Sequence, residues 1–210
     1  MKSNDLALWY LRLNGFLSVP NFVLHPTRRG PQVTEADIIA VRFPHRAEFD
    51  EDPNADDRRF AKRVTKPYFI VAESTSGICK LNDPWTKADA FRYVLRAFGP
   101  VVPDRVPVVA ARWVEAGVYS DECIDCALLC FGASEDLDLR RRYPSVDQIP
   151  WSEVVGFFHR RFSTYDRRKR DHEQWDLVGN KLWDFWKQSQ CKEDQFWARV
   201  CQECALPPNQ

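Results

Sequence analysis

The sequence of 210 residues has few glycines and no excess charge of either sign. Its 8 glycines are scattered along the chain, so they form no glycine-rich loop that could cradle a phosphate. The 4 histidines show no metal-ligand spacing, and no serine or cysteine lies in a nucleophile elbow. These absences argue against a mononucleotide-binding loop, a histidine metal centre and a hydrolase of the serine or cysteine type.

Long hydrophobic runs are also absent. The longest apolar stretches have the length of strands, well short of the roughly 20 residues that a membrane-spanning helix needs. The N-terminal residues lack the basic-then-apolar layout of a signal peptide. We therefore expect a soluble, cytoplasmic protein without a membrane partner. Since Lys plus Arg and Asp plus Glu number 30 each, binding to nucleic acid would depend on local basic patches.

The 7 cysteines are expected to be reduced in such a compartment. Cys123 and Cys126, together with Cys201 and Cys204, have the spacing of two zinc-binding pairs. No glycine or proline shapes either pair into a knuckle. Buried, reduced cysteines are therefore favoured over a zinc site, because cysteine packs as a small hydrophobic residue. We expect no zinc.

Hydrophobic periodicity predicts an α/β protein with a mixed sheet flanked by helices. The predicted strands cover residues 16–24, 36–43, 68–72, 78–81, 106–113 and 123–131. The predicted helices cover residues 4–13, 86–98, 152–162, 165–188 and 193–204. The charged segment 44–66 is expected to be a surface insertion with a short helix near residues 57–64.

Two acidic residues lie at the ends of strand-like runs. Asp37 occurs in the run 34–41, and Glu73 ends the apolar run 68–73. Two carboxylates brought together on neighbouring strands form a hard-oxygen site of the kind that holds magnesium against a phosphate. Glu35 shares a strand face with Asp37, although it is equally compatible with a surface charge.

The order of these features resembles the PD-(D/E)xK nuclease superfamily, which includes restriction-endonuclease-like and Holliday-junction-resolvase-like proteins. The resemblance covers about residues 3–131: a helix, Gly15 and Phe16, a strand, a basic loop, an acidic strand, a second acidic strand and a helix. Residues 35–39 match the first acidic motif. Glu73 matches the acid of the Glu-x-Lys motif, and Thr75 occupies the position of its lysine.

The resemblance implies a restriction-endonuclease-like domain at residues 1–135, followed by a helical extension at 136–210. It implies that Asp37, Glu73 and the backbone carbonyl of Ser74 bind Mg²⁺ or Mn²⁺. The implied activity is hydrolysis of phosphodiester bonds in nucleic acid, DNA rather than RNA.

The catalytic lysine is an open question. In some members of the superfamily this lysine is found on a neighbouring element. Lys80 is therefore the candidate for a displaced lysine, and Lys87 is a second one. Both are also compatible with ordinary solvated lysines, which is the favoured interpretation. Thr75 leaves open a catalytically degenerate protein that binds nucleic acid or a protein partner, or that associates with itself.

A basic run interleaved with aromatic residues lies near the C-terminal helices. Between Arg140 and Arg170, nine Lys or Arg against three Asp or Glu give a local excess of +6. Such a patch could lie on a phosphate backbone. Equally, its charges could pair with acidic residues at 50–57 or with Asp166 and Asp171. The candidate nucleic-acid contacts are Arg28, Arg29, Arg92, Arg96, Arg160, Arg161, Arg167, Arg168, Lys169 and Arg170.

Overall fold

The computed structural model describes residues 1–25, 34–46, 56–61, 65–169, 176–190 and 192–207, with the side chains of 168 and 169 outside that description. The strands are β1 (Phe16–Leu24), β2 (Thr34–Arg42), β3 (Tyr68–Ser74), β4 (Val118–Ser120), β5 (Asp125–Gly132) and β6 (Asp147–Pro150). The α-helices are α1 (Ser3–Leu13), α2 (Arg58–Ala61), α3 (Ala88–Phe98), α4 (Val106–Ala116), α5 (Leu137–Arg142), α6 (Trp151–Lys169), α7 (Leu177–Gln188) and α8 (Glu193–Cys204). Two 3₁₀ turns lie at Asp83–Thr86 and Pro103–Arg105.

The strands form one mixed six-stranded sheet in the order β1, β2, β3, β5, β4, with β6 also paired to β5. β1, β2 and β3 are antiparallel neighbours, whereas β3 and β5 run parallel. A parallel neighbour needs a crossover, and α3 and α4 lie in the connection between β3 and β5.

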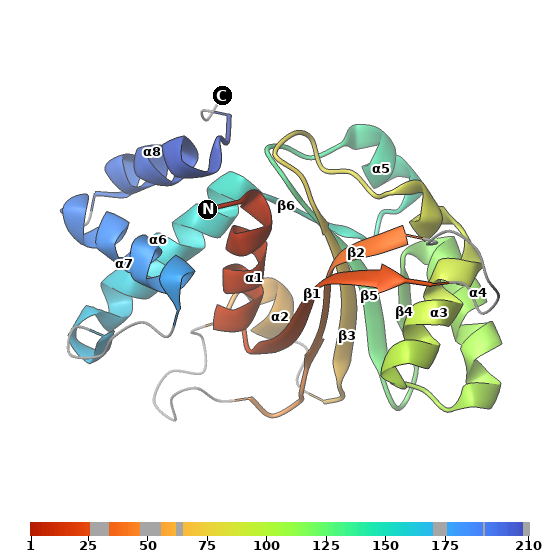
Figure 1. Cartoon of the computed structure of the whole chain (residues 1–210). Coiled ribbons are helices and arrows are strands. Elements are labelled where there is room, and N and C mark those ends of the chain that lie inside the picture. Colours follow the sequence, from red (N-terminus) through yellow and green to blue (C-terminus); the bar gives the residue numbers. More distant parts are fainter. Residues whose placement is uncertain (26–33, 47–55, 62–64, 170–175, 191, 208–210) are drawn as a thin grey trace.

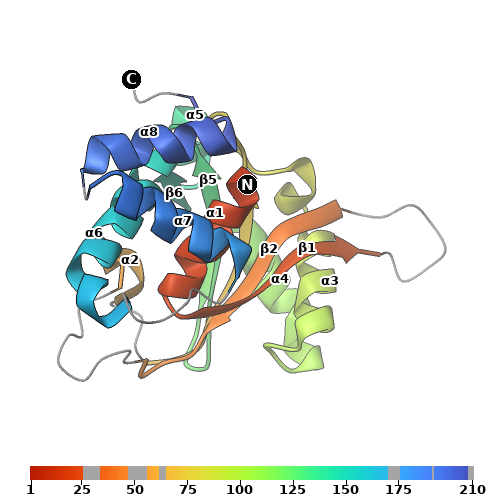
Figure 2. The same cartoon turned by 60° about the vertical axis from the view of Figure 1, so that its left-hand side comes forward.

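Helices cover both faces of the sheet (Figure 1). One face packs against α1 and α6, and Figure 2 shows α7 and α8 lying farther from the sheet against these helices. The other face packs against α3 and α4. Along β5, Ala127, Leu129 and Phe131 enter the first core, and Cys126, Leu128 and Cys130 enter the second. The central strands are therefore buried on both faces, as their continuous apolar runs predict.

The predicted fold class is confirmed at the level of a mixed α/β sheet between helices. The strand at 16–24 lies at the edge of the sheet, as expected from Pro20. Proline has no backbone N–H group, and an edge strand tolerates this because it pairs with a neighbour on one side only. The helix predicted at 86–98 ends as expected, because Gly99 adopts the left-handed conformation at φ 64°. It begins later than expected, with Lys87 rather than Thr86 at the N-cap.

The prediction of a strand at 106–113 is wrong, because these residues form helix α4. The buried side chains Val106, Val109, Ala110 and Trp113 recur at helical spacing. A proline in the first turn and Gly117 with φ 71° after the last turn mark the two ends. The valine-rich composition suggested a strand, but the spacing and end signals are those of a helix.

Two other predicted elements differ from the structure. Residues 78–81 form no strand, and the loop that contains them packs against the end of β5 through the hydrogen bond from Cys79 N to Ser134 O, 2.9 Å long. The helix predicted at 165–188 is divided between α6, which extends to Lys169, and α7, which begins at Leu177. Tyr165 has non-helical backbone angles and marks a kink within α6. Asp176 caps α7 by accepting a hydrogen bond from Gly179 N.

The predicted boundary at residue 135 does not separate two hydrophobic cores. β6 extends the sheet beyond that boundary, and side chains of α6, α7 and α8 share one cluster with α1 and the central strands. The C-terminal helices therefore complete the cover of one sheet face. None of the described helices combines the length and the apolar character that a membrane span requires.

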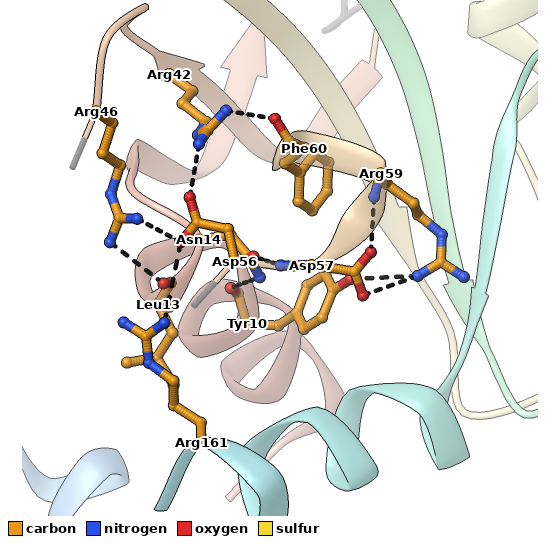
Figure 3. Close-up of polar contacts among 10 residues, drawn as sticks. All are labelled: Tyr10, Leu13, Asn14, Arg42, Arg46, Asp56, Asp57, Arg59, Phe60 and Arg161. Carbon is orange, nitrogen blue, oxygen red and sulfur yellow. Dashed lines mark hydrogen bonds and ion pairs between the residues drawn. The ribbon is translucent and has the colours of Figure 1, made fainter. Parts of the chain in front are cut away.

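The described part of the predicted surface insertion is anchored in the core by a buried ion network (Figure 3). The Asp56 carboxylate forms ion pairs with Arg42 Nη2, at 2.6 Å, and with Arg46 Nη1. Arg161 Nη1 lies 3.9 Å from Asp56 Oδ1. The side chains of Asp56, Arg42 and Arg161 are only 6%, 3% and 1% exposed. Gly15 makes room for this arrangement, because a Cβ at that position would lie 1.9 Å from Arg46.

The neighbouring residues tie α2 to α1. Asp57 N donates to Asn14 Oδ1 at 2.6 Å, and Arg42 Nη1 donates to the carbonyl of Phe60 at 2.6 Å. Phe60 itself is fully buried against Tyr10 and Phe16. The expectation of a purely surface segment is therefore wrong for these residues, because their arginine and aromatic contacts bury them between α1, β2 and α6.

We predict that Asp56→Asn lowers the free energy of unfolding by about 3–5 kcal/mol, because buried arginines lose their shared counter-charge. Urea unfolding followed by tryptophan fluorescence measures the loss. Asp89→Asn is the matched control, since Asp89 is 71% exposed and pairs with Arg92 on the helix surface. The control change should cost less than about 1 kcal/mol. Equal losses in the two variants would contradict a special role of the buried network.

Candidate metal site

The register of β2 and β3 brings the two predicted acids together. Ile38 pairs with Ala72, so Asp37 and Glu73 are the next residues on adjacent antiparallel strands. Ser74 N donates to Asp37 Oδ2 at 2.7 Å, and the hydroxyl of Ser74 lies 3.4 Å from the same oxygen. Asp37 is half-buried, whereas Glu73 is only 3% exposed. The structure thus places both carboxylates at one end of the β2 and β3 pair.

Neutral donors hold the buried Glu73 carboxylate. Trp85 Nε1 donates to Oε1 at 2.6 Å, and Asn82 Nδ2 donates to Oε2. Trp85 belongs to the core against α3 and α4, so Glu73 faces that side of the sheet. No described arginine or lysine forms an ion pair with Glu73, which leaves its charge balanced only by hydrogen bonds.

The loop after β3 is held close to the sheet, and this sets the position of Asn82 and Trp85. Ala133 N donates to Gly77 O at 2.6 Å. Gly132 permits the close approach, because a Cβ there would lie 2.6 Å from Cys79 N and 2.8 Å from Gly77 O. Thr75 O accepts a hydrogen bond from Trp151 Nε1 at 2.8 Å, which links the same loop to α6.

The environment raises the pKa of Glu73 from 4.5 to about 8. Burial is the main cause, and the negative charge of Asp37 is the second. Hydrogen bonds from Trp85, the Asp37 backbone and Asn82 act in the opposite direction. A pair of carboxylates in which one has a strongly raised pKa is a common feature of functional sites.

The chemistry of the pair suits a hard cation that keeps part of its water shell. Magnesium is commonly bound through one or two carboxylates, with waters in the remaining positions. Within the described ranges, no group of three or more His, Cys, Asp or Glu side chains is placed to share an ion. Asp37 and Glu73 are therefore a two-carboxylate candidate, with the Ser74 backbone beside them.

The candidate lysines do not join the acids in the structure. Lys80 is exposed and lines a different pocket with Glu135, Asp136 and Arg141. Lys87 is exposed at the start of α3. In the described part of the chain, no lysine forms a hydrogen bond or ion pair with Asp37 or Glu73. At the motif position, the Thr75 hydroxyl accepts a hydrogen bond from Gly77 N at 3.2 Å.

The candidate nucleic-acid contacts separate into two groups. Arg92 and Arg96 lie on α3, on the sheet face that Glu73 also faces; Arg92 pairs with Asp89, and Arg96 is exposed. Arg160, Arg161 and Arg167 lie on α6, across the sheet from the acids. Arg160 and Arg167 are exposed, but Arg161 is buried beside Asp56 and so does not present its charge to a surface phosphate.

The remaining predicted contacts lie outside what the structure describes. These are Arg28, Arg29 and Arg170, together with the side chains of Arg168 and Lys169. The pairing of the basic run with the acidic segment, which the sequence left open, is found for Arg161 and Asp56.

The sheet separates the two cysteine pairs. Cys126 lies in the core beside α3 and α4, Cys201 and Cys204 lie in the opposite core, and Cys123 is exposed. Burial raises the pKa of Cys201 to about 11 and that of Cys204 to about 12. The preference for buried thiols is thus confirmed for three of these four residues, and the four do not converge on one point.

Sequence reasoning missed the residues that hold the polar centres. Asn82 and Trp85 follow Glu73 by nine and twelve positions, and only the return of the loop brings them to it. A buried tryptophan needs an acceptor for its N–H group, which was the available signal for Trp85. Arg42, a charge at the end of a buried strand, was the corresponding signal for a buried acidic partner.

No family model, no curated protein and no solved structure matches this chain.

We predict a pH effect on stability that depends on Glu73. Below about pH 4.5 the carboxyl is protonated in both states; between about pH 4.5 and 8 the folded state retains a proton that the unfolded state releases. The free energy of unfolding therefore falls as pH rises through this window, by about 4–5 kcal/mol for the whole shift. Urea unfolding across this range measures the change.

The Glu73→Gln variant is the comparison, because its side chain does not ionise. Its stability should fall less steeply between pH 4.5 and 8 than that of the wild type. Parallel curves for the two proteins would show that Glu73 does not titrate as described.

Proposed function

We propose that this chain is a metal-dependent phosphodiesterase with a restriction-endonuclease-like core, acting on nucleic acid, DNA rather than RNA. The observation that carries the proposal is the pairing of Asp37 with a buried Glu73 at adjacent positions of β2 and β3. Two acids this close repel each other when ionised, and a divalent cation between them would offset the repulsion.

The order of elements supports this proposal. The elements of this part of the chain follow in the order α1, β1, β2, α2, β3, α3, α4, β4 and β5; β1, β2 and β3 are antiparallel neighbours, and β5 runs parallel to β3. The resemblance noted in the sequence rests on the same order of helix, acidic strands and helix. Asp37 and Glu73 lie at one end of the paired stretch of β2 and β3, where Ser74 N donates to Asp37, and this position is compatible with the resemblance.

Asp37, Glu73 and the backbone of Ser74 would hold the ion. When bound, Mg²⁺ or Mn²⁺ would lower the pKa of a coordinated water and neutralise charge on the scissile phosphate. The protein's own groups prepare this site: Asn82 and Trp85 fix the Glu73 carboxylate, and Ser74 N fixes Asp37. Arg92 and Arg96 on α3, which covers the sheet face that Glu73 also faces, would contact the phosphate backbone.

Binding without cleavage is the second candidate, and the position of the lysines favours it. The superfamily lysine positions the attacking water and neutralises charge that develops on the phosphate, whereas Thr75 offers only a hydroxyl. Lys80, the candidate substitute, lines another pocket. A protein with the acid pair and, among the described residues, no lysine bound to it could bind metal and nucleic acid without hydrolysis.

We predict that Tb³⁺, used in place of Mg²⁺, binds at the acid pair and emits light sensitised by Trp85, whose Nε1 lies 2.6 Å from Glu73 Oε1. Asp37→Asn and Glu73→Gln should each weaken Tb³⁺ binding about tenfold or more, because each removes a charged ligand. Excess Mg²⁺ should displace the Tb³⁺. The exposed carboxylate Asp89 supplies the control Asp89→Asn, and an effect of equal size there would place the ion elsewhere.

We predict that the wild-type protein cuts labelled DNA with Mg²⁺ or Mn²⁺, and that a chelator stops the cleavage. Asp37→Asn and Glu73→Gln should each lower the rate about a hundredfold or more, since several kcal/mol of charge stabilisation are lost. Lys80→Ala measures the contribution of the displaced-lysine candidate. Gel electrophoresis of the products gives the rates.

The same assay separates the two candidates. If only Thr75→Lys cuts, and the wild type binds DNA in a salt-dependent manner without cutting it, the binding function is supported. If the wild type neither cuts nor binds nucleic acid, both candidates are wrong.

A further inference from the structure

A second polar site lies on the opposite side of the sheet from the acid pair. A pocket of about 710 Å³ opens between α2 and α6. Its lining includes Arg58, Arg59, Arg160, Arg161, Phe157 and Tyr165. This volume is within the range of small-molecule sites, which is about 300–1,000 Å³.

The carboxylates of this pocket are already bound by arginines. Asp56 is shared by Arg42, Arg46 and Arg161. Arg59 pairs with both Asp57 and Glu153. Three acids lining the pocket are therefore engaged within the protein.

Two further cations line the same pocket. Arg58 and Arg160 are exposed, and neither forms an ion pair with a residue in the described part of the chain. Both side chains are therefore available to an anion that enters from solvent. Arginine binds phosphate oxygens through paired N–H groups, which gives it an advantage over lysine for this class of ligand.

The inner wall of the pocket is ordered before any ligand enters. The Arg161 guanidinium lies 5.1 Å from the centre of the Tyr165 ring and is held by Asp56. Arg59 is fixed by ion pairs on both sides, and its Nη1 lies 3.4 Å from the Tyr10 hydroxyl. Preorganised cations lower the conformational cost of binding.

We propose that this pocket binds a phosphate-bearing ligand of nucleotide size through the exposed Arg58 and Arg160, on an ordered wall that includes Arg59 and Tyr165. The phosphate comes from a free nucleotide or from the phosphorylated end of a nucleic acid chain. The site shares no residue with Asp37 and Glu73, so it does not depend on the proposed nuclease function.

Isothermal titration calorimetry of the full chain without divalent metal tests the proposal. The probes are pyrophosphate, adenosine 5′-triphosphate, and one short single-stranded DNA with and without a 5′-phosphate. Arg58→Gln and Arg160→Gln should each weaken binding of the phosphorylated probes about tenfold. Arg112→Gln is the matched control, because Arg112 is an exposed arginine on α4, across the sheet, and has no part in the proposed nuclease site.

The outcomes distinguish the two sources of the phosphate, or show that the pocket does not bind phosphate. Binding of the nucleotide alone identifies a free ligand, and a preference for the 5′-phosphorylated DNA identifies a chain end; either supports the pocket. No binding of any probe at millimolar concentration overturns the proposal. Equal weakening by Arg112→Gln also overturns it, since that result indicates attraction by the surface charge in general.

Discussion

The antiparallel pairing of β2 with β3 is the constraint on which both polar centres depend. At one end of this pair Arg42 lies opposite Tyr68, and at the other end Asp37 and Glu73 follow the pair of Ile38 with Ala72. The two ends are five residues apart along β2, roughly 16 Å. A shift of β2 by one residue against β3 would turn every β2 side chain to the opposite face of the sheet. Arg42 would then point away from Asp56, and Asp37 away from Glu73.

The two polar centres surround their buried carboxylates with different partners. Asp56 is surrounded by arginines of β2, the following loop and α6, and so acts as a counter-ion that joins these elements. Among the described residues, Glu73 has neutral donors and a second acid nearby, and its pKa rises to about 8. The first arrangement stabilises the fold, whereas the second keeps an acid in an unfavourable environment that a cation would relieve.

The sequence predicted those parts of the structure in which local pattern and tertiary contacts agree. The continuous apolar runs of β3 and β5 and the capped helix α3 are of this kind. Helix α4 was missed because its valines favour a strand locally, although their spacing is helical. The acid pair followed from the order of strands. Asn82, Trp85 and Asp56 could not be predicted, because they reach their partners only through loop crossings and contacts distant in the sequence.

The proposed function requires that Asp37 and Glu73 share a divalent cation. Crystals soaked in Mn²⁺ and measured near the manganese absorption edge test it most directly, because anomalous scattering locates the metal without any assumption about activity. If the two acids share the ion, an anomalous peak is expected within about 2.3 Å of a carboxylate oxygen of each. Anomalous peaks that occur only elsewhere, with Glu73 still bound to Asn82 and Trp85 and no ion beside it, would show that the two acids do not bind the cation together.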